Sequence, residues 1–92
     1  MKPIAFNESP RLGVLTTAAV LAGAPILLVS HDEDDGGWQF TCGTTNEPAD
    51  GRIVHLEEIV TMDPTVAAVA DLPLGWVAFR SAVGGDWNRE PQ

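Results

Sequence analysis

The chain has 92 residues, which is enough for one domain but not for two. Thirteen acidic residues against five lysines and arginines give a formal net charge of −8. Such a charge repels nucleic acids and anionic membrane surfaces, and it raises the encounter rate with a basic protein. Composition therefore argues against a nucleic-acid or membrane partner and favours a basic protein partner.

The N-terminal part predicts a loose arm, a strand and a short helix. Residues 1–10 are polar and contain two prolines, which is typical of a loosely attached arm. Residues 12–16 predict a short strand. Thr17 is a suitable N-cap for a helix over residues 18–22, and Gly23 suits the C-terminal end of that helix.

Residues 12–29 contain no charged side chain, so this stretch has to be considered as a membrane or export segment. Threonines, glycines and Pro25 interrupt it, whereas a spanning helix needs about 20 strongly apolar residues. Ala22 to Ala24 match an A-x-A signal-peptidase site, but Glu8 interrupts a region that a signal peptide keeps basic. We therefore expect a cytoplasmic protein, with export as the less favoured alternative.

A hairpin with an acidic loop is predicted next. Residues 26–29 form an apolar run between Pro25 and a polar loop, as a buried strand does. Glycines at 36 and 37 permit a turn, because glycine adopts positive φ angles readily. Apolar residues then alternate with polar ones over residues 38–42, which predicts a strand with one apolar face.

The next segment predicts a strand followed by two short helices. Residues 53–56 begin as a strand, after which apolar residues fall at the helical spacing of 56, 59 and 60. Asp63 followed by Pro64 is a helix start signal, since aspartate is a suitable N-cap and proline is favoured in the first turn of a helix. This second helix is expected to end before Pro73.

The last segment predicts a second hairpin. Residues 76–80 read as a strand, glycines at 84 and 85 as a turn, and residues 86–89 as an edge strand before a tail over residues 90–92. The whole chain, residues 1–92, is therefore expected to be a single small α+β domain. We expect an antiparallel sheet of about four to five strands with two or three short helices covering one face.

Several short motifs follow one another in order over about half of the chain. They are an aromatic strand with a glycine, a helix, an Asp-Pro pair, and a Pro-x-Gly that opens a strand ending in arginine: Gly37, Trp38, Gln39, Phe40, Gly43, Leu56, Ile59, Asp63, Pro64, Leu72, Pro73, Gly75 and Arg80. In these motifs the chain resembles a family of small bacterial domains of unknown function that are grouped with predicted immunity proteins. The resemblance implies a mixed α+β domain that binds and blocks a toxin made by the same cell, and it brings no catalytic residues.

His31 and the carboxylates of residues 32–35 are the strongest candidate for a metal site. Counted as a calcium loop from Asp32, the twelfth position is Gly43, where the loop needs a glutamate. Zinc would require further histidine or cysteine ligands at suitable spacing. We therefore expect no metal site and no cofactor.

Catalytic motifs are absent from the sequence, which has no G-x-S-x-G, no Gly-rich phosphate loop and no His-x-x-x-His. We expect no catalytic residues. Two alternatives stay open: a small enzyme or metal-dependent domain that uses His31 and the nearby aspartates, and a structural or regulatory subunit that self-associates through residues 86–89.

Four consecutive carboxylates close to a tryptophan favour a surface that contacts a basic protein. Tryptophan and arginine are favoured anchors at interfaces, although Trp38 and Trp76 can equally fill the core. Trp87 is the tryptophan that we expect to be exposed, and Arg80 either contacts a partner or pairs with the acidic loop. The sequence thus predicts a noncatalytic protein-binding domain, for example an immunity-type inhibitor, with candidate binding residues Asp32, Glu33, Asp34, Asp35, Trp38, Arg80 and Trp87.

Overall fold

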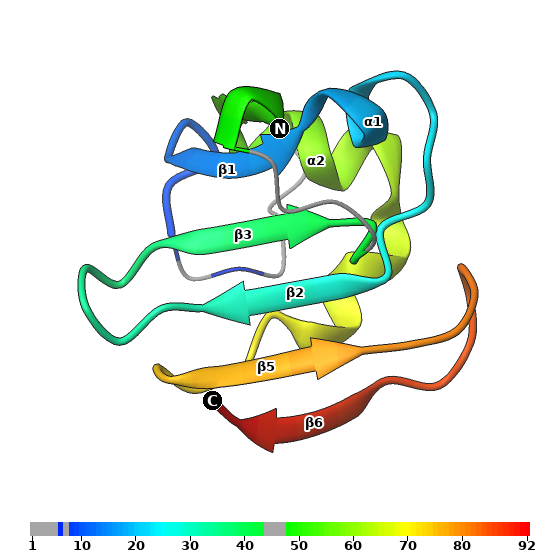
Figure 1. The fold of residues 1–92 in the computed structure, drawn as a ribbon. Helices are drawn as coiled ribbons and strands as arrows, with labels where there is room; N and C mark the ends of the chain where they lie inside the picture. Colours follow the sequence, from blue (N-terminus) through cyan, green and yellow to red (C-terminus); the bar gives the residue numbers. More distant parts are fainter. Residues whose placement is uncertain (1–5, 7, 44–47) are drawn as a thin grey trace.

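Six short strands form one sheet in the computed structural model, which describes residues 6, 8–43 and 48–92 (Figure 1). The strands are β1 (Gly13–Thr17), β2 (Leu28–His31), β3 (Trp38–Thr41), β4 (Gly51–His55), β5 (Trp76–Phe79) and β6 (Asn88–Pro91). The helices are α1 (Ala18–Leu21), η1 (Pro48–Asp50), α2 (Leu56–Met62) and η2 (Pro64–Val69), of which η1 and η2 are 3₁₀ helices. This arrangement confirms the α+β class.

The strand order is β4-β1-β3-β2-β5-β6, and the sheet is mixed. All neighbours are antiparallel except β1 and β3, which run parallel with Leu15 opposite Gln39. The expectation of an antiparallel sheet with four to five strands is therefore wrong in strand number and in one pairing. Apolar alternation places residues on a face, but it carries no information on the direction of the neighbouring strand.

The apolar stretch over residues 12–29 is divided among β1, α1 and the start of β2. Thr17 caps α1, because its Oγ1 accepts from the backbone N–H of Val20 at 3.2 Å. Gly23 follows with a φ of 115°, and it lets the chain turn back toward the sheet. None of the helices in the described residues is long and apolar enough to span a membrane.

The first hairpin is shifted relative to the expected strand. β2 covers Leu28–His31 rather than residues 26–29, because His31 still pairs with Trp38 on one side and with Trp76 on the other. β3 has the expected alternation: the side chains of Trp38 and Phe40 are buried, and those of Gln39 and Thr41 are half-buried on the opposite face.

The edge strand of the second hairpin is shifted by two residues from the expected 86–89. β6 begins at Asn88 and ends at Pro91, so Glu90 and Pro91 pair with Val77 and Trp76 instead of belonging to a tail. The backbone N–H of Gln92 donates to the carbonyl of Gly75 at 2.8 Å. The C-terminus is therefore held beside the start of β5.

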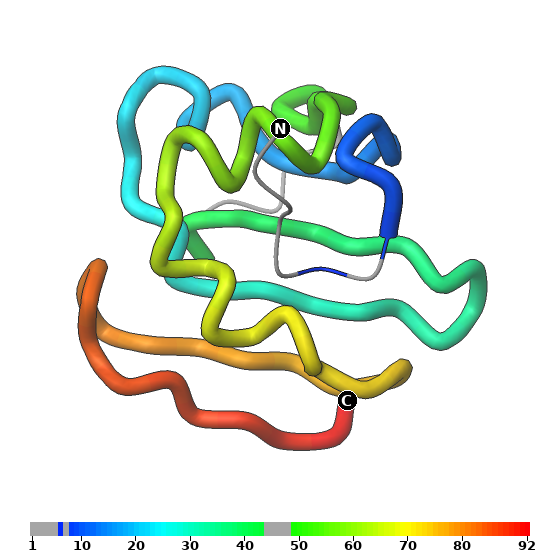
Figure 2. Tube along the Cα trace, turned by 180° about the vertical axis from the view of Figure 1, so that it is seen from behind, coloured from blue at the N-terminus to red at the C-terminus, as the bar shows by residue number. Residues whose placement is uncertain are grey.

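The core lies between the sheet and the helices α2 and η2, which stand in front of the sheet in Figure 2. It is built from alternate residues of the strands and from the apolar stripes of the helices, principally Val14, Val29, Trp38, Phe40, Ala78, Leu56, Ile59, Val66 and Val69. The apolar side chains that recur every 3.6 residues in the helices and every second residue in the strands thus face one shared core.

The expected loose arm over residues 1–10 lies partly outside the described residues. Within it, Phe6 is buried and packs edge-on against Trp38, with 5.0 Å between the ring centroids. Glu8 accepts a hydrogen bond from the indole Nε1 of Trp38 at 3.1 Å. These two residues attach this segment to the core next to β3.

Candidate functional site

The acidic residues 32–35 form the turn between β2 and β3. The turn is closed by backbone hydrogen bonds from Asp32 N–H to the Gly37 carbonyl at 2.8 Å and from Gly36 N–H to the Asp32 carbonyl at 2.9 Å. Gly36 has a φ of 72°, which only glycine adopts without strain. The Asp35 carboxylate accepts from Gly37 N–H at 2.8 Å. The carboxylates thus stand on a turn, residues 32–37, that is closed by its own hydrogen bonds.

An open hollow of about 460 Å³ lies over this turn, and we call it the acidic hollow. It is lined by Asp32, Glu33, Asp34, Asp35, Gln39, Gly75 and Gln92. Asp32 is half-buried, and its carboxylate accepts from the side-chain amides of Gln39 at 2.6 Å and Gln92 at 3.4 Å. Glu33, Asp34 and Asp35 are exposed. The hollow therefore combines four carboxylates with two amide groups.

The glutamate of this turn lies against the start of β5. A Cβ on Gly75 would sit 3.2 Å from Oε2 of Glu33, and Gly75 also has a φ of 80°. Its N–H donates to the carbonyl of His31 at 2.7 Å. The positive φ therefore favours glycine at this position, and a side chain here would also require the Glu33 carboxylate to shift.

Within the described part of the chain, no lysine or arginine forms an ion pair with residues 32–35. Arg80 pairs with Asp63, and Arg89 pairs with Asp71. Arg52 donates instead to the backbone carbonyls of residues 49 and 51. Among the described residues, the carboxylates of the acidic hollow therefore have no cationic partner.

Trp38 does not belong to an exposed surface, since only 1% of it is exposed. Its ring stacks on His31, with 4.0 Å between centroids and 15° between planes, and it also contacts Phe6 and Phe40. Of the two roles that the sequence left open, filling the core is the one that this burial supports.

Arg80 is buried at the opposite end of β5 from the acidic turn. Its guanidinium donates to the carboxylate of Asp63 at 2.7 Å, to Oγ1 of Thr65 at 2.8 Å and to the carbonyl of Ile26 at 2.9 and 3.1 Å. Of the two roles that the sequence left open for Arg80, the pairing with the acidic loop is wrong. β5 runs antiparallel to β2, so Arg80 lies beside the start of β2, whereas the loop follows its end.

Trp87 is half-buried rather than fully exposed. Its ring lies over the guanidinium of Arg80, with 4.1 Å between Cζ and the ring centroid. This is the geometry of a cation–π contact. Arg80 and Trp87 therefore belong to one structural cluster, separate from the acidic hollow.

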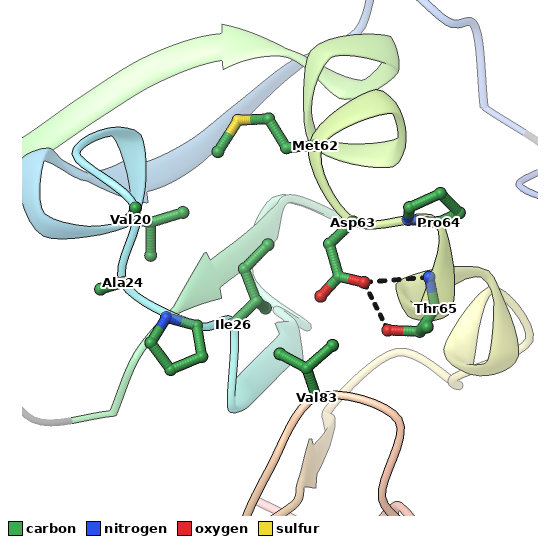
Figure 3. A pocket seen from close by; sticks show the side chains of 10 residues that line it. Val20, Ala24, Ile26, Met62, Asp63, Pro64, Thr65 and Val83 are labelled. Carbon is green, nitrogen blue, oxygen red and sulfur yellow. Dashed lines mark hydrogen bonds between the residues drawn. The ribbon is translucent and has the colours of Figure 1, made fainter.

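A second hollow of about 370 Å³ opens next to this cluster (Figure 3). Apart from Asp63 and Thr65, the lining residues are apolar or glycine: Val20, Gly23, Ala24, Pro25, Ile26, Met62, Pro64 and Val83. The carboxylate of Asp63 accepts hydrogen bonds from Thr65 (Figure 3) and from Arg80, so its oxygens already have donors. This hollow offers apolar contact and no free charge.

His31 does not join the aspartates that follow it. Its Nδ1 donates to the carbonyl of Leu72 at 2.7 Å, and its ring stacks on Trp38. Among the described residues, no group of three or more histidine, cysteine or acidic side chains is placed to hold a metal ion. The geometry therefore gives no support to the alternative in which His31 and the aspartates bind a metal.

Three of the residues that line the acidic hollow were not identified from the sequence: Gln39, Gly75 and Gln92. The alternation in β3 does place Gln39 on the face opposite the core, but only the sheet topology brings Gly75 and Gln92 to the acidic turn.

No family model matches this chain, and neither a curated protein nor a solved structure matches it.

Proposed function

We propose that this chain is a noncatalytic binding domain that holds a basic protein through the acidic hollow. The observation that carries the proposal is the grouping of four carboxylates in one hollow without a neutralising cation in the described part of the chain. Like charges held close together repel one another. A lysine or arginine side chain from a partner relieves this repulsion and is also steered to the hollow by the net charge.

The polar groups of the hollow suit a cationic side chain. Asp32 is oriented by Gln39 and Gln92, while Glu33 and Asp34 have no hydrogen bond from another side chain within the described residues. Free carboxylate oxygens accept from a lysine ammonium or, in a bidentate manner, from an arginine guanidinium. A toxin-blocking immunity protein, which the family resemblance implies, would be one protein of this kind.

The test is a pull-down from a lysate of the native host with the wild-type chain and the D32N/D34N/D35N variant as baits. A matched control, E57Q/D71N/D86N, loses the same formal charge outside the hollow. We expect a basic protein, identified by mass spectrometry, to be retained by the wild type and the control and to be lost with the loop variant. Its retention should weaken at high ionic strength, since exposed charges are screened.

Equal recovery of the same proteins with the loop variant would show that the acidic hollow does not bind the partner. Equal loss with both variants would assign the effect to net charge rather than to the hollow. Either result would overturn the proposal. Asp34 and Asp35 are exposed and Asp32 is half-buried, and circular dichroism of each bait establishes whether the fold is retained.

A further inference from the structure

One face of the sheet points away from α2 and η2, and we call it the open face (Figures 1 and 2). Its residues follow from the strand alternation and the register, and they are both polar and apolar: Gly13, Leu15, Thr17, Leu28, Ser30, Gln39, Thr41, Gly51, Ile53, His55, Val77, Phe79, Asn88 and Glu90. Ile53 is 71% exposed and Phe79 is 38% exposed. A solvated sheet face is usually polar, so these apolar side chains indicate a contact surface.

The most exposed of them, Ile53, lies on the edge strand β4. It stands opposite Leu15 on β1, so the two side chains form a cross-strand pair on the open face. Gly13 leaves room for this pair, because a Cβ there would approach Cγ2 of Ile53 to 3.3 Å. The pair forms part of a further open hollow of about 240 Å³.

This hollow adjoins the acidic hollow. Both are lined by Asp32, Asp35 and Gln39, and Gln39 lies directly beside Leu15 in the parallel pairing of β1 and β3. Carboxylates therefore stand at one end of a single surface, and Ile53 stands at the other. The distance from β3 across β1 to β4 is two strand spacings, which is about 10 Å.

We propose that the partner crosses the open face as an extended segment with two kinds of anchor. A lysine or arginine occupies the acidic hollow, and an apolar side chain packs on Leu15 and Ile53. An extended chain advances about 3.3 Å per residue, so the two anchors are roughly two to four residues apart on the same side of the segment. This inference rests on the proposed function, and it adds the chemistry of the segment that the site recognises.

A second copy of this chain is a poor occupant of the surface. Each chain carries a formal charge of −8 and has its own acidic hollow on this surface, so a second copy would be repelled. Such like-charge contacts are unfavourable at an interface. Charge complementarity therefore selects a basic segment of a different protein.

The experiment uses two short synthetic peptides of equal length and equal charge as probes. One repeats Lys-Ser-Leu-Ser-Leu-Ser, which puts leucines two and four residues after each lysine on the same side of an extended chain, and the other repeats Lys-Ser-Ser-Ser-Ser-Ser. Binding is measured by fluorescence anisotropy. We expect the wild-type chain to bind the leucine-containing peptide about tenfold more tightly, since partial burial of one leucine contributes this much affinity.

Two variants test whether the preference for the leucine-containing peptide depends on Ile53. Ile53→Ser changes a largely exposed side chain, so the fold tolerates it. It should remove the tenfold preference while leaving the affinity for the serine peptide unchanged. Val83→Ser is the matched control, because Val83 is also exposed but lines the hollow of Figure 3. This control should keep the preference.

The outcomes separate this inference from the proposed function. If D32N/D34N/D35N weakens both peptides but Ile53→Ser changes neither, the acidic hollow stands as a binding site and the apolar anchor is wrong. If the triple variant binds both peptides like the wild type, the proposed function itself is wrong. If the wild type binds neither peptide, both are overturned.

Discussion

Arg80 and Asp63 form an ion pair of 2.7 Å in which the arginine side chain is fully buried and the aspartate side chain is 12% exposed. The same guanidinium holds the carbonyl of Ile26 and the hydroxyl of Thr65. One side chain thereby ties the end of β5 to the segment before β2 and to the start of η2. The arginine is a structural residue in this fold, although the sequence alone left a binding role open.

Removal of one partner of this pair should destabilise the domain strongly. Arg80→Ala leaves a largely buried aspartate without its cation, and the loss expected for such a change is about 3–5 kcal/mol in the free energy of unfolding. Chemical denaturation monitored by circular dichroism measures it. Arg89→Ala is the matched control, since its pair with Asp71 is exposed and should contribute far less. Similar losses in the two variants would contradict a special role for Arg80.

The ring of Trp87 should contribute through its contact with Arg80. Trp87→Ala removes both the cation–π contact at 4.1 Å and the cover that the ring gives to the guanidinium. A contact of this kind is worth about 0.5–2 kcal/mol, depending on how well the cation is desolvated. Trp87→Phe keeps an aromatic face and should recover part of that stability. The prediction is wrong if thermal unfolding shows the phenylalanine variant to be no more stable than the alanine variant.

Local signals in the sequence predicted the local structure well. Thr17 caps α1, Asp63 accepts from Thr65 N–H at the start of η2, and Trp38 and Phe40 alternate into the core. Each of these depends on residues within a few positions of one another, so the chemistry is readable from the sequence.

Features that join distant segments were not readable in this way. The parallel pairing of β1 with β3 places Leu15 beside Gln39, 24 positions later, and this creates the surface that links the acidic hollow to Ile53. The pairing of Arg80 with the acidic loop, one of two roles that the sequence left open, is wrong for the same reason, because strand direction decides which carboxylate lies near a charged residue. The acidic turn itself was predicted, but the neighbours that make it a hollow come from β3, β5 and the C-terminus.

Gly75 should be needed for the geometry of the acidic hollow. Gly75→Ala places a side chain at a φ of 80° and 3.2 Å from Glu33, which costs roughly 1–3 kcal/mol of backbone strain and also displaces the glutamate. Gly84→Ala is the matched control, because Gly84 has a φ of 83° with nothing within 4 Å of its Cβ position. Both variants should lose stability, but only Gly75→Ala should alter the affinity for the lysine peptides. An unchanged affinity would show that Glu33 is not a determinant of binding.

The carboxylate of Asp71 should titrate below the ordinary range of an aspartate. Its Oδ1 accepts a hydrogen bond from Nη1 of Arg89 at 2.8 Å, and this bond lowers the pKa of Asp71. Because the pKa of Asp71 is lower in the folded state than in the unfolded chain, the contact stabilises the fold fully at any pH above the unfolded-state pKa of Asp71. This stabilisation is lost as the pH falls through the lower, folded-state pKa. NMR titration of the side-chain carboxyl carbon measures the value directly.

The Arg89→Gln variant supplies the comparison for this titration. Without the guanidinium, the pKa of Asp71 should return toward its ordinary value, and the acid limb of the stability profile should become less steep. Since the pair is exposed, added salt should reduce the shift in the wild type but should have little effect in the variant. If the pKa of Asp71 were the same in both proteins, the contact between β6 and the segment after η2 would not persist in solution.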